Sequence, residues 1–272
     1  MLLRAFVLLA TGLALTVGGG PAAAQGGADI YVTPRFWYTF IGEKTINSVD
    51  FANNFAEASE NVGAALYGGT IAIVPKGLGG TALNLTAFYG SGSGAYRALD
   101  GGGLKYRGDQ DISRLDVEGL FQIPLGKGGA YWAIGGRYVN IDVDIKGRDD
   151  AVPAAQPFRF KDKRDIYLAE LGIGAIAPIT PKHRFFGGVT VVAGYEHVRL
   201  DDQCCGGFTE LSKHSGAVVG IDANAGFAID LAPAVTFTGR YRVFALSDLG
   251  FDFKEAVDIV HGPEVSLTFK LN

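Results

Sequence analysis

The chain is dominated by segments in which apolar and polar residues alternate at every second position. In residues 235–243, threonine and arginine occupy the even positions, and apolar residues or glycine occupy the odd ones. In residues 264–271, Val265, Leu267, Phe269 and Leu271 alternate with polar or charged side chains. Because successive side chains of a β-strand point to opposite faces, this period of two predicts strands with one apolar and one polar face.

Ten segments with this pattern, some clearer than others, follow one another along the chain. There is room at each for the roughly nine to eleven residues that a tilted membrane-spanning strand needs. The alternation is poorest in the second and sixth segments, so eight and twelve strands stay open as alternatives to ten. The ten ranges are 29–41, 64–74, 81–89, 112–125, 131–142, 167–179, 185–197, 216–231, 235–244 and 264–271.

The connections between these segments alternate between short and long. Short ones span residues 75–80, 124–128, 177–183 and 232–234. Long polar ones span residues 42–61, 90–111, 146–163, 200–215 and 245–258. Short periplasmic turns opposite long extracellular loops are typical of outer-membrane barrels. The sequence therefore predicts an all-β fold: a closed antiparallel transmembrane β-barrel of about ten strands.

Aromatic residues near the strand ends agree with two interfacial girdles of such a barrel. Trp132, Phe185 and Phe269 are expected at the periplasmic rim. Phe40, Tyr89, Tyr138 and Tyr195 are expected at the outer rim of the barrel. Glycine is frequent, with 40 residues, and it relieves crowding at bends of a tightly curved sheet.

The first 24 residues have the features of a cleavable secretory signal peptide. Arg4 is followed by an apolar stretch from Ala5 to Val17, and Ala22, Ala23 and Ala24 form a small-residue cleavage site. That stretch is shorter than the roughly twenty residues of a membrane-spanning helix. Residues 25–272 are then one barrel domain. Removing Arg4 changes the net charge from −4 to −5, and the absence of a basic patch argues against a nucleic-acid partner.

As a whole, residues 25–272 resemble the small outer-membrane β-barrels of Gram-negative bacteria, the OmpA-like and OmpW-like proteins. The resemblance implies a non-enzymatic surface barrel in the outer membrane, supporting envelope integrity and interacting through its loops. It implies contacts with outer-membrane lipid, lipopolysaccharide and the barrel-assembly machinery, and no cofactor. A porin-like small channel for polar or weakly hydrophobic solutes is the first alternative, and a membrane-embedded hydrolase is the second. The oligomeric state is left open.

The polar residues at every second position of the strands include charges of both signs, which the core of a soluble protein would hardly bury. If the apolar parity faces lipid, these charges face the lumen and pair across it, which favours a mostly plugged interior over an open pathway. The expected lumen charge network comprises Arg35, Arg114, Asp116, Glu118, Arg137, Glu170, Glu196, Asp222, Arg240, Arg242 and Glu264.

Two rim motifs invite comparison with the omptins, ten-stranded outer-membrane proteases. Asp142-Val143-Asp144 supplies paired carboxylates, and Glu196-His197 lies at the outer end of another strand. The Glu-His pair is adjacent, however, where omptins have Asp-x-His. His197 also lies upstream of Ser212 and Ser215, a combination that a hydrolase needs, although the spacing does not orient them. We expect no catalytic residues here.

The segment 200–215 holds metal-ligand residue types, including Asp201, Cys204, Cys205 and His214. Their spacing matches no standard metal site. A vicinal disulfide between Cys204 and Cys205 is the candidate interpretation, with pairing between chains as an alternative. The glycine-serine run at 90–94 lacks the context of a phosphate-binding loop and is expected to be a flexible loop.

Overall fold

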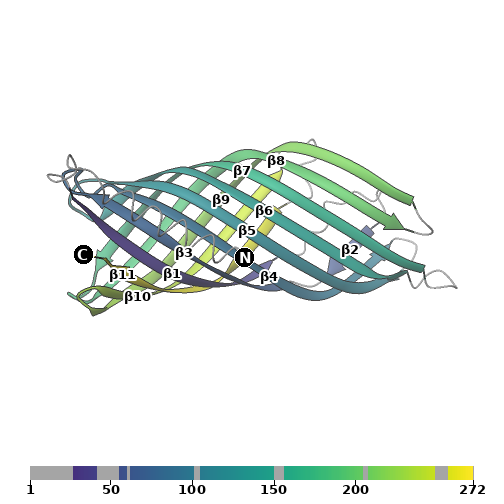
Figure 1. Cartoon of the computed structure of the whole chain (residues 1–272), viewed down its shortest axis with the longest axis horizontal. Coiled ribbons are helices and arrows are strands. Elements are labelled where there is room, and N and C mark those ends of the chain that lie inside the picture. Colours follow the sequence, from purple (N-terminus) through teal and green to yellow (C-terminus); the bar gives the residue numbers. More distant parts are fainter. Residues whose placement is uncertain are drawn as a thin grey trace.

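The computed structural model describes residues 27–41, 55–59, 62–100, 105–149, 156–204, 208–248 and 257–271. The predicted signal peptide lies outside these residues. The described chain is built from antiparallel strands (Figure 1). They are β1 (Ala28–Ile41), β2 (Phe55–Ser59), β3 (Val62–Pro75), β4 (Ala82–Asp100), β5 (Lys105–Pro124), β6 (Ala130–Asp149), β7 (Gln156–Pro178), β8 (His183–Cys204), β9 (Phe208–Ala232), β10 (Val235–Asp248) and β11 (Val257–Lys270).

Ten of these strands close into a single barrel. Each pairs with its neighbours along the chain, and the sheet closes where β1 pairs with β11. The short strand β2 pairs with the outer end of β4, at Phe55–Asp100, beyond the region where β4 pairs with β3. The prediction of a closed ten-stranded antiparallel barrel is confirmed. Closure leaves the barrel wall without a free edge, as a strand structure in lipid requires.

The seam between β1 and β11 is the interrupted part of this wall. Its pairing skips Thr33 and Pro34, and skips Tyr38 and Thr39 again further out, opposite Pro263. Proline has no backbone N–H and cannot donate to the ladder. The pairing of β1 with β3 on its other side, in contrast, runs without a gap.

Side chains bridge the interrupted seam from the lumen. The hydroxyl groups of Thr33 and Thr268 lie 3.0 Å apart across the inner gap. The indole N–H of Trp37 donates to the carbonyl oxygen of Gly262 at 3.3 Å beside the outer gap. The closing seam is therefore held partly by side chains where the backbone ladder is missing.

Most of the predicted long loops are strands rather than loops. β4 continues to Asp100 and β5 begins at Lys105, so most of the segment 90–111 is paired sheet. β6 and β7, and likewise β8 and β9, extend in the same way and form long hairpins at the right of Figure 1. The prediction of long loops was wrong because polar residues on the outward face indicate where the lipid ends, and strand pairing continues beyond that point.

The glycine-serine run at 90–94 is also a strand and not a flexible loop. Gly90 and Gly92 face inward, and Ser91 and Ser93 face outward. A Cβ atom at Gly90 would lie 1.9 Å from the carbonyl oxygen of Ala65 on β3. The glycines are therefore required by a close approach of two backbones.

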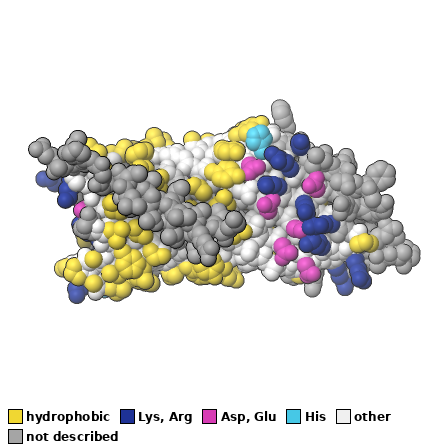
Figure 2. All heavy atoms as spheres, in the orientation of Figure 1, with side chains coloured by type: hydrophobic (Ala, Val, Ile, Leu, Met, Phe, Trp, Pro, Cys, Tyr) yellow, Lys and Arg dark blue, Asp and Glu magenta, His cyan; other side chains and the backbone are white. Residues whose placement is uncertain are grey.

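A belt of exposed apolar side chains surrounds one half of the barrel. Tyr67, Leu171, Val191 and Phe185 are all more than half exposed on its outer face. Figure 2 shows this belt in yellow on the left half, with the acidic and basic side chains gathered beyond it on the right. No helix long and apolar enough to cross a membrane occurs in the described ranges. The belt is the surface that a bilayer would cover.

Candidate functional site

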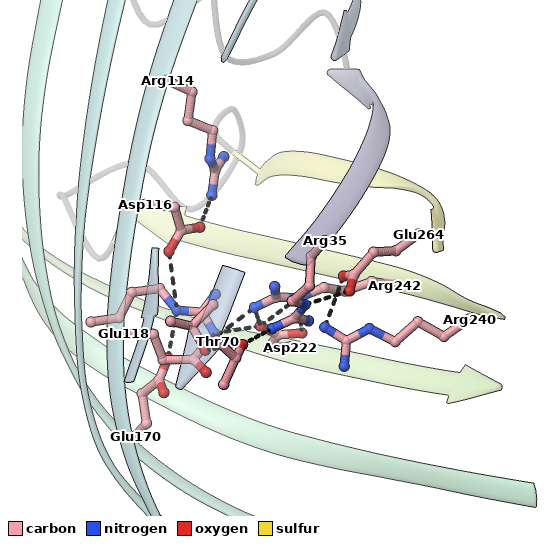
Figure 3. A network of polar contacts seen from close by, with 12 residues as sticks. Arg35, Thr70, Arg114, Asp116, Glu118, Glu170, Asp222, Arg240, Arg242 and Glu264 are labelled. Atoms are coloured by element: carbon pink, nitrogen blue, oxygen red, sulfur yellow. Dashed lines mark hydrogen bonds and ion pairs between the residues drawn. The ribbon is translucent and has the colours of Figure 1, made fainter. Parts of the chain in front are cut away.

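Most charges in the lumen lie in one layer, which we name the charge layer, and its central group is the Arg137 guanidinium on β6. Arg137 Nε lies 2.8 Å from a carboxylate oxygen of Glu170, and Nη2 lies 2.6 Å from Asp222. Arg137 also pairs with Glu118 and is 3.7 Å from Asp116. One buried cation thus joins carboxylates from β5, β7 and β9. Besides Arg137, the layer comprises the residues labelled in Figure 3: Arg35, Thr70, Arg114, Asp116, Glu118, Glu170, Asp222, Arg240, Arg242 and Glu264.

Two further arginines extend this cluster. Arg242 on β10 binds both oxygens of Asp222 and lies 3.3 Å from Glu118 across the lumen. Arg114 lies 3.1 Å from the carboxylate of Asp116, two residues along the same strand. Each carboxylate therefore has an arginine partner, as buried charges require.

A second cluster lies beside the seam. Glu264 on β11 accepts a hydrogen bond from Arg35 Nε at 2.6 Å and from Arg240 Nη2 at 2.8 Å. Arg35 also donates to the hydroxyl group of Thr70, which is 2.9 Å from that of Thr86. Glu264 therefore ties β1 to β10 through the strand between them.

The structure brings together ten of the eleven predicted lumen residues in the charge layer; the eleventh is Glu196. Glu196 is also inward-facing and buried, on β8. Asp162 and Arg164 on β7, which were not predicted, form a further inward pair whose charged atoms are 2.7 Å apart. Their signal was present, because both residues share the parity of Glu170.

Beyond the charge layer, towards the outer end of the barrel, most inward side chains are apolar and form what we name the apolar plug, with the buried Asp162–Arg164 pair among them on β7. Its side chains are buried and come from all ten barrel strands, with Trp37 and Phe244 almost fully inaccessible. On β1, β5, β6 and β10, the inward residue immediately beyond the charged one is apolar. The plug comprises Trp37, Ile41, Val62, Ala64, Leu66, Phe88, Ile112, Val139, Ile141, Val143, Ile145, Phe160, Ile166, Leu168, Val192, Val218, Phe244, Leu246 and Val260.

Aromatic rings of the plug cap the charge layer directly. The guanidinium of Arg242 lies 4.9 Å from the Trp37 ring centre, and that of Arg137 lies 4.8 Å from the Phe244 ring centre. Arg35 makes the same contact with Phe88 at 4.8 Å. Cations over ring faces are stabilised electrostatically, and more so when they are removed from water. The two layers are thus in direct contact at these rings.

The omptin-like motifs do not converge in space. Glu196 faces inward, while His197 faces outward because it is the next residue of the same strand. Asp142 and Asp144 lie on the outer wall on β6, separated from β8 by the whole of β7. Asp144 is engaged by Arg159, with atoms 2.8 Å apart, and this hydrogen bond lowers the pKa of Asp144 to about 2. These residues do not form a catalytic group.

His197 instead has a partner on the neighbouring strand. Its Nδ1 lies 2.7 Å from the hydroxyl oxygen of Ser215 on β9, and both side chains are exposed. Asp165 on β7 is opposite His197 in the sheet, but its carboxylate accepts hydrogen bonds from Tyr138 and Asn140. The sheet therefore aligns Asp165, His197 and Ser215, a combination that sequence spacing did not orient.

The predicted disulfide and the metal-ligand residue types of segment 200–215 fall partly outside the described residues. Cys205 is outside them, and of Cys204 only the backbone at the end of β8 is described. The side chain of His214 is likewise not described. Within the described residues, no group of three or more metal-binding side chains is present. The vicinal disulfide stays a prediction.

Comparisons with known proteins yield similarities of fold. No protein-family model and no curated protein matches this chain. Among solved structures, the outer membrane protease OmpT from Escherichia coli covers 90% of this chain and 96% of its own at 12% identity, with a TM-score of 0.45. Neisserial surface protein A covers 90% and 99% at 10% identity, with a TM-score of 0.33. The Pseudomonas putida toluene transporter TodX covers 94% and 73% at 9% identity, with a TM-score of 0.38.

These identities are too low to transfer a function. The fold assignment rests on the closed ten-stranded topology and the apolar belt. The chain has the fold of the small outer-membrane β-barrels.

Proposed function

We propose that this protein is a non-conducting, non-enzymatic surface barrel of the outer membrane, which supports envelope integrity and presents its outer end for contacts. The observation that carries this proposal is the apolar plug. Its buried side chains come from every strand of the barrel and pack on the rings above the charge layer. A solute path along the barrel axis would have to pass through this core.

The plug disfavours the alternative of a polar-solute channel for an energetic reason. A hydrated ion that enters an apolar core loses its hydration without gaining polar partners, which costs many kcal/mol. The charge layer does not offer a continuous path either, because its arginines and carboxylates are paired with each other. The interior is better suited to rigidity than to transport.

Single-channel recording in planar lipid bilayers tests the proposal. We expect the folded wild-type protein to show no steady openings. A triple variant, Trp37→Ala, Phe88→Ala and Phe244→Ala, removes the rings that cap the charge layer and is expected to show openings. A control variant, Phe185→Ala, Phe227→Ala and Phe237→Ala, truncates three outward aromatic side chains and should stay silent. Steady conductance of the wild-type protein would refute the proposal.

The outer half of the barrel wall supports the proposed contacts with lipopolysaccharide. On the face that Figure 2 shows, acidic and basic side chains gather on the wall beyond the belt. Assembly into the membrane by the barrel-assembly machinery belongs to the same proposal. Cells that lack the protein are then expected to be more sensitive to detergents and large antibiotics, and a variant that retains the plug should restore resistance.

A hydrolase is the second candidate, and a specific observation favours it: the hydrogen bond between His197 and Ser215 just outside the belt. A serine activated by histidine attacks esters, and an aligned carboxylate would orient the imidazole. Incubation of the purified protein with phospholipid and lipid A, followed by mass spectrometry of released fatty acids, tests this candidate. Release that is lost in Ser215→Ala would establish it, and no release would eliminate it.

A further inference from the structure

We propose that the outer wall of β7, β8 and β9 is a binding site for one phosphorylated lipid of the outer leaflet, with its headgroup on a row of cations and an acyl chain in the groove below. This inference rests on the proposed surface barrel in the outer membrane and names the ligand class of its wall. It concerns the outside of the barrel and does not depend on the lumen being closed.

The headgroup part of the site is a row of three cations on adjacent strands. Lys163 on β7 is opposite Arg199 on β8, and Arg199 is opposite Lys213 on β9. All three side chains are exposed on the outward face. Like charges placed directly opposite each other destabilise a sheet unless an anion compensates them. A phosphate group is such an anion, because Lys and Arg bind it through charge-assisted hydrogen bonds.

Carboxylates near the row compensate it only in part. Asp165 interacts electrostatically with Lys163 and Arg199, but its hydrogen bonds go to Tyr138 and Asn140 on the β6 side. Asp142 on β6 is opposite Lys163. The ion pairs found between described residues do not include any of the three cations. The cationic row is therefore open to an anion from solution or from the membrane.

Below the cations, the same three strands form successively less polar rows. Along the outward face towards the membrane, the first row after the cations consists of Asp165, His197 and Ser215. The next row consists of Tyr167, Tyr195 and Ala217. Tyrosines with exposed rings mark the level of the membrane interface. The cationic row lies four residues beyond them along each strand, at the level where lipid headgroups are expected. Its position favours a membrane lipid over a free anion.

The acyl-chain part of the site is an apolar groove on the outward face of β8, β9 and β10. It has a volume of about 330 Å³ and is lined by Val191, Val219, Gly220, Ile221, Ala245, Leu246 and Ser247 of β8, β9 and β10. Val219 is six residues from Lys213 along β9, a separation of about 20 Å along a strand. With a tilt of about 40°, this is about 15 Å along the membrane normal, a distance that an acyl chain can span from a headgroup held on the cations.

The two parts together specify an amphiphile. Three cations match a headgroup that carries more than one negative charge, such as the phosphate monoesters of lipid A, better than a phosphodiester with one charge. The groove matches an acyl chain that continues from such a headgroup. Ser215 and His197 lie between them and offer polar atoms to the sugar and ester groups.

Binding of lipid A to the full-chain protein in detergent, measured by native mass spectrometry, tests the site. The triple variant Lys163→Ala, Arg199→Ala and Lys213→Ala is expected to bind lipid A at least tenfold more weakly than wild type. A matched control, Lys76→Ala, Lys127→Ala and Lys182→Ala, removes the same charge from the opposite end of the barrel and should bind as wild type does. A heat-dependent gel shift verifies that each variant is folded.

Three further arms identify the ligand chemistry. Dephosphorylated lipid A and phosphatidylglycerol should each bind wild type about as weakly as lipid A binds the triple variant. Inorganic phosphate at millimolar concentration should not compete, because it lacks the chain. Ala245→Phe, which fills the groove, should weaken binding of lipid A but not of its deacylated saccharide.

Equal binding of lipid A by wild type and the triple variant would overturn the proposal, as would undiminished binding of dephosphorylated lipid A. Competition by inorganic phosphate would replace the lipid site by a simple anion site and overturn it too. Channel conductance by a protein that still binds lipid A through this row would refute the non-conducting function and leave the lipid site standing.

Discussion

The two halves of this barrel have opposite polarity. In the half surrounded by the belt, the outer face is apolar and the lumen contains paired charges around Arg137. In the outer half, the same strands turn charged side chains outward and pack an apolar plug inside. On β6, for example, Trp132 and Ile134 face outward below Tyr138, whereas Asp142 and Asp144 face outward above it.

This difference shows that the solvent outside the wall decides which side of a strand is apolar. Lipid accepts apolar side chains without cost, so the charges go inside, where they must pair. Water accepts charges, so the outer half buries its apolar residues as a soluble barrel does. One continuous sheet therefore combines a membrane barrel and a soluble-type core, and four predictions probe the difference between them.

The largest effect is expected for Arg137→Leu in the charge layer. The substitution leaves Glu118, Glu170 and Asp222 buried with less positive charge, which costs about 4–5 kcal/mol of the free energy of unfolding. Urea unfolding in lipid vesicles, followed by tryptophan fluorescence and gel mobility, measures it. Lys182→Leu on an exposed turn is the control, and a loss below about 1 kcal/mol for Arg137→Leu would contradict the role of the layer.

Phe244→Ala tests the plug. Truncation of this buried ring removes its contacts with Arg114 and Arg137 and leaves a cavity, for an expected loss of about 3–4 kcal/mol. Phe237→Ala on the same strand faces the belt, where lipid fills the space, and should cost about 1 kcal/mol or less. The same unfolding measurement applies to both variants. Equal losses would show that the outer half lacks a packed core.

Introducing arginine on the outward face compares the two halves directly. Leu171→Arg places a charge in the belt on β7, with an expected loss of about 2–4 kcal/mol in lipid. Ser93→Arg places it on the exposed outward face of β4 in the outer half, where the change should stay within about 0.5 kcal/mol. If both variants unfold at the wild-type urea concentration, the belt does not mark the bilayer.

The smallest effect concerns pH and the Asp144–Arg159 pair of the outer half. The pKa of Asp144 is lowered to about 2 from an ordinary value of 3.8, so the carboxylate is more stable ionised in the folded protein. Its contribution to stability is complete above the ordinary pKa and is lost as the pH falls from 3.8 towards 2.

Unfolding midpoints measured between about pH 2 and pH 5 test this expectation. Wild type should lose more stability over this range than Asp144→Asn, by a small margin because the pair is partly exposed. Identical pH profiles for the two proteins would show that the pair does not contribute.

Much of the fold follows from the sequence because lipid imposes a strict rule on it. Alternation predicted ten strands, and the alternating turn lengths predicted antiparallel closure. The ends of the strands could not be predicted in this way. Residues 139–145 keep their period of two, but the apolar residues pass from the outward to the inward parity. This exchange of faces is visible in the sequence, and it is the signal that could have revealed both the plug and the strand extensions.

The sequence by itself determined that the chain forms a closed barrel whose inward-facing positions carry charges such as Arg137. The reason is that the alternation of polar and apolar residues depends only on neighbours along one strand. Tertiary structure decided which charges meet. Arg242 reaches Glu118 across the lumen, and Lys163, Arg199 and Lys213 form one row through the register of three strands. Register and curvature set these distances between residues far apart in sequence, and spacing along one chain does not encode them.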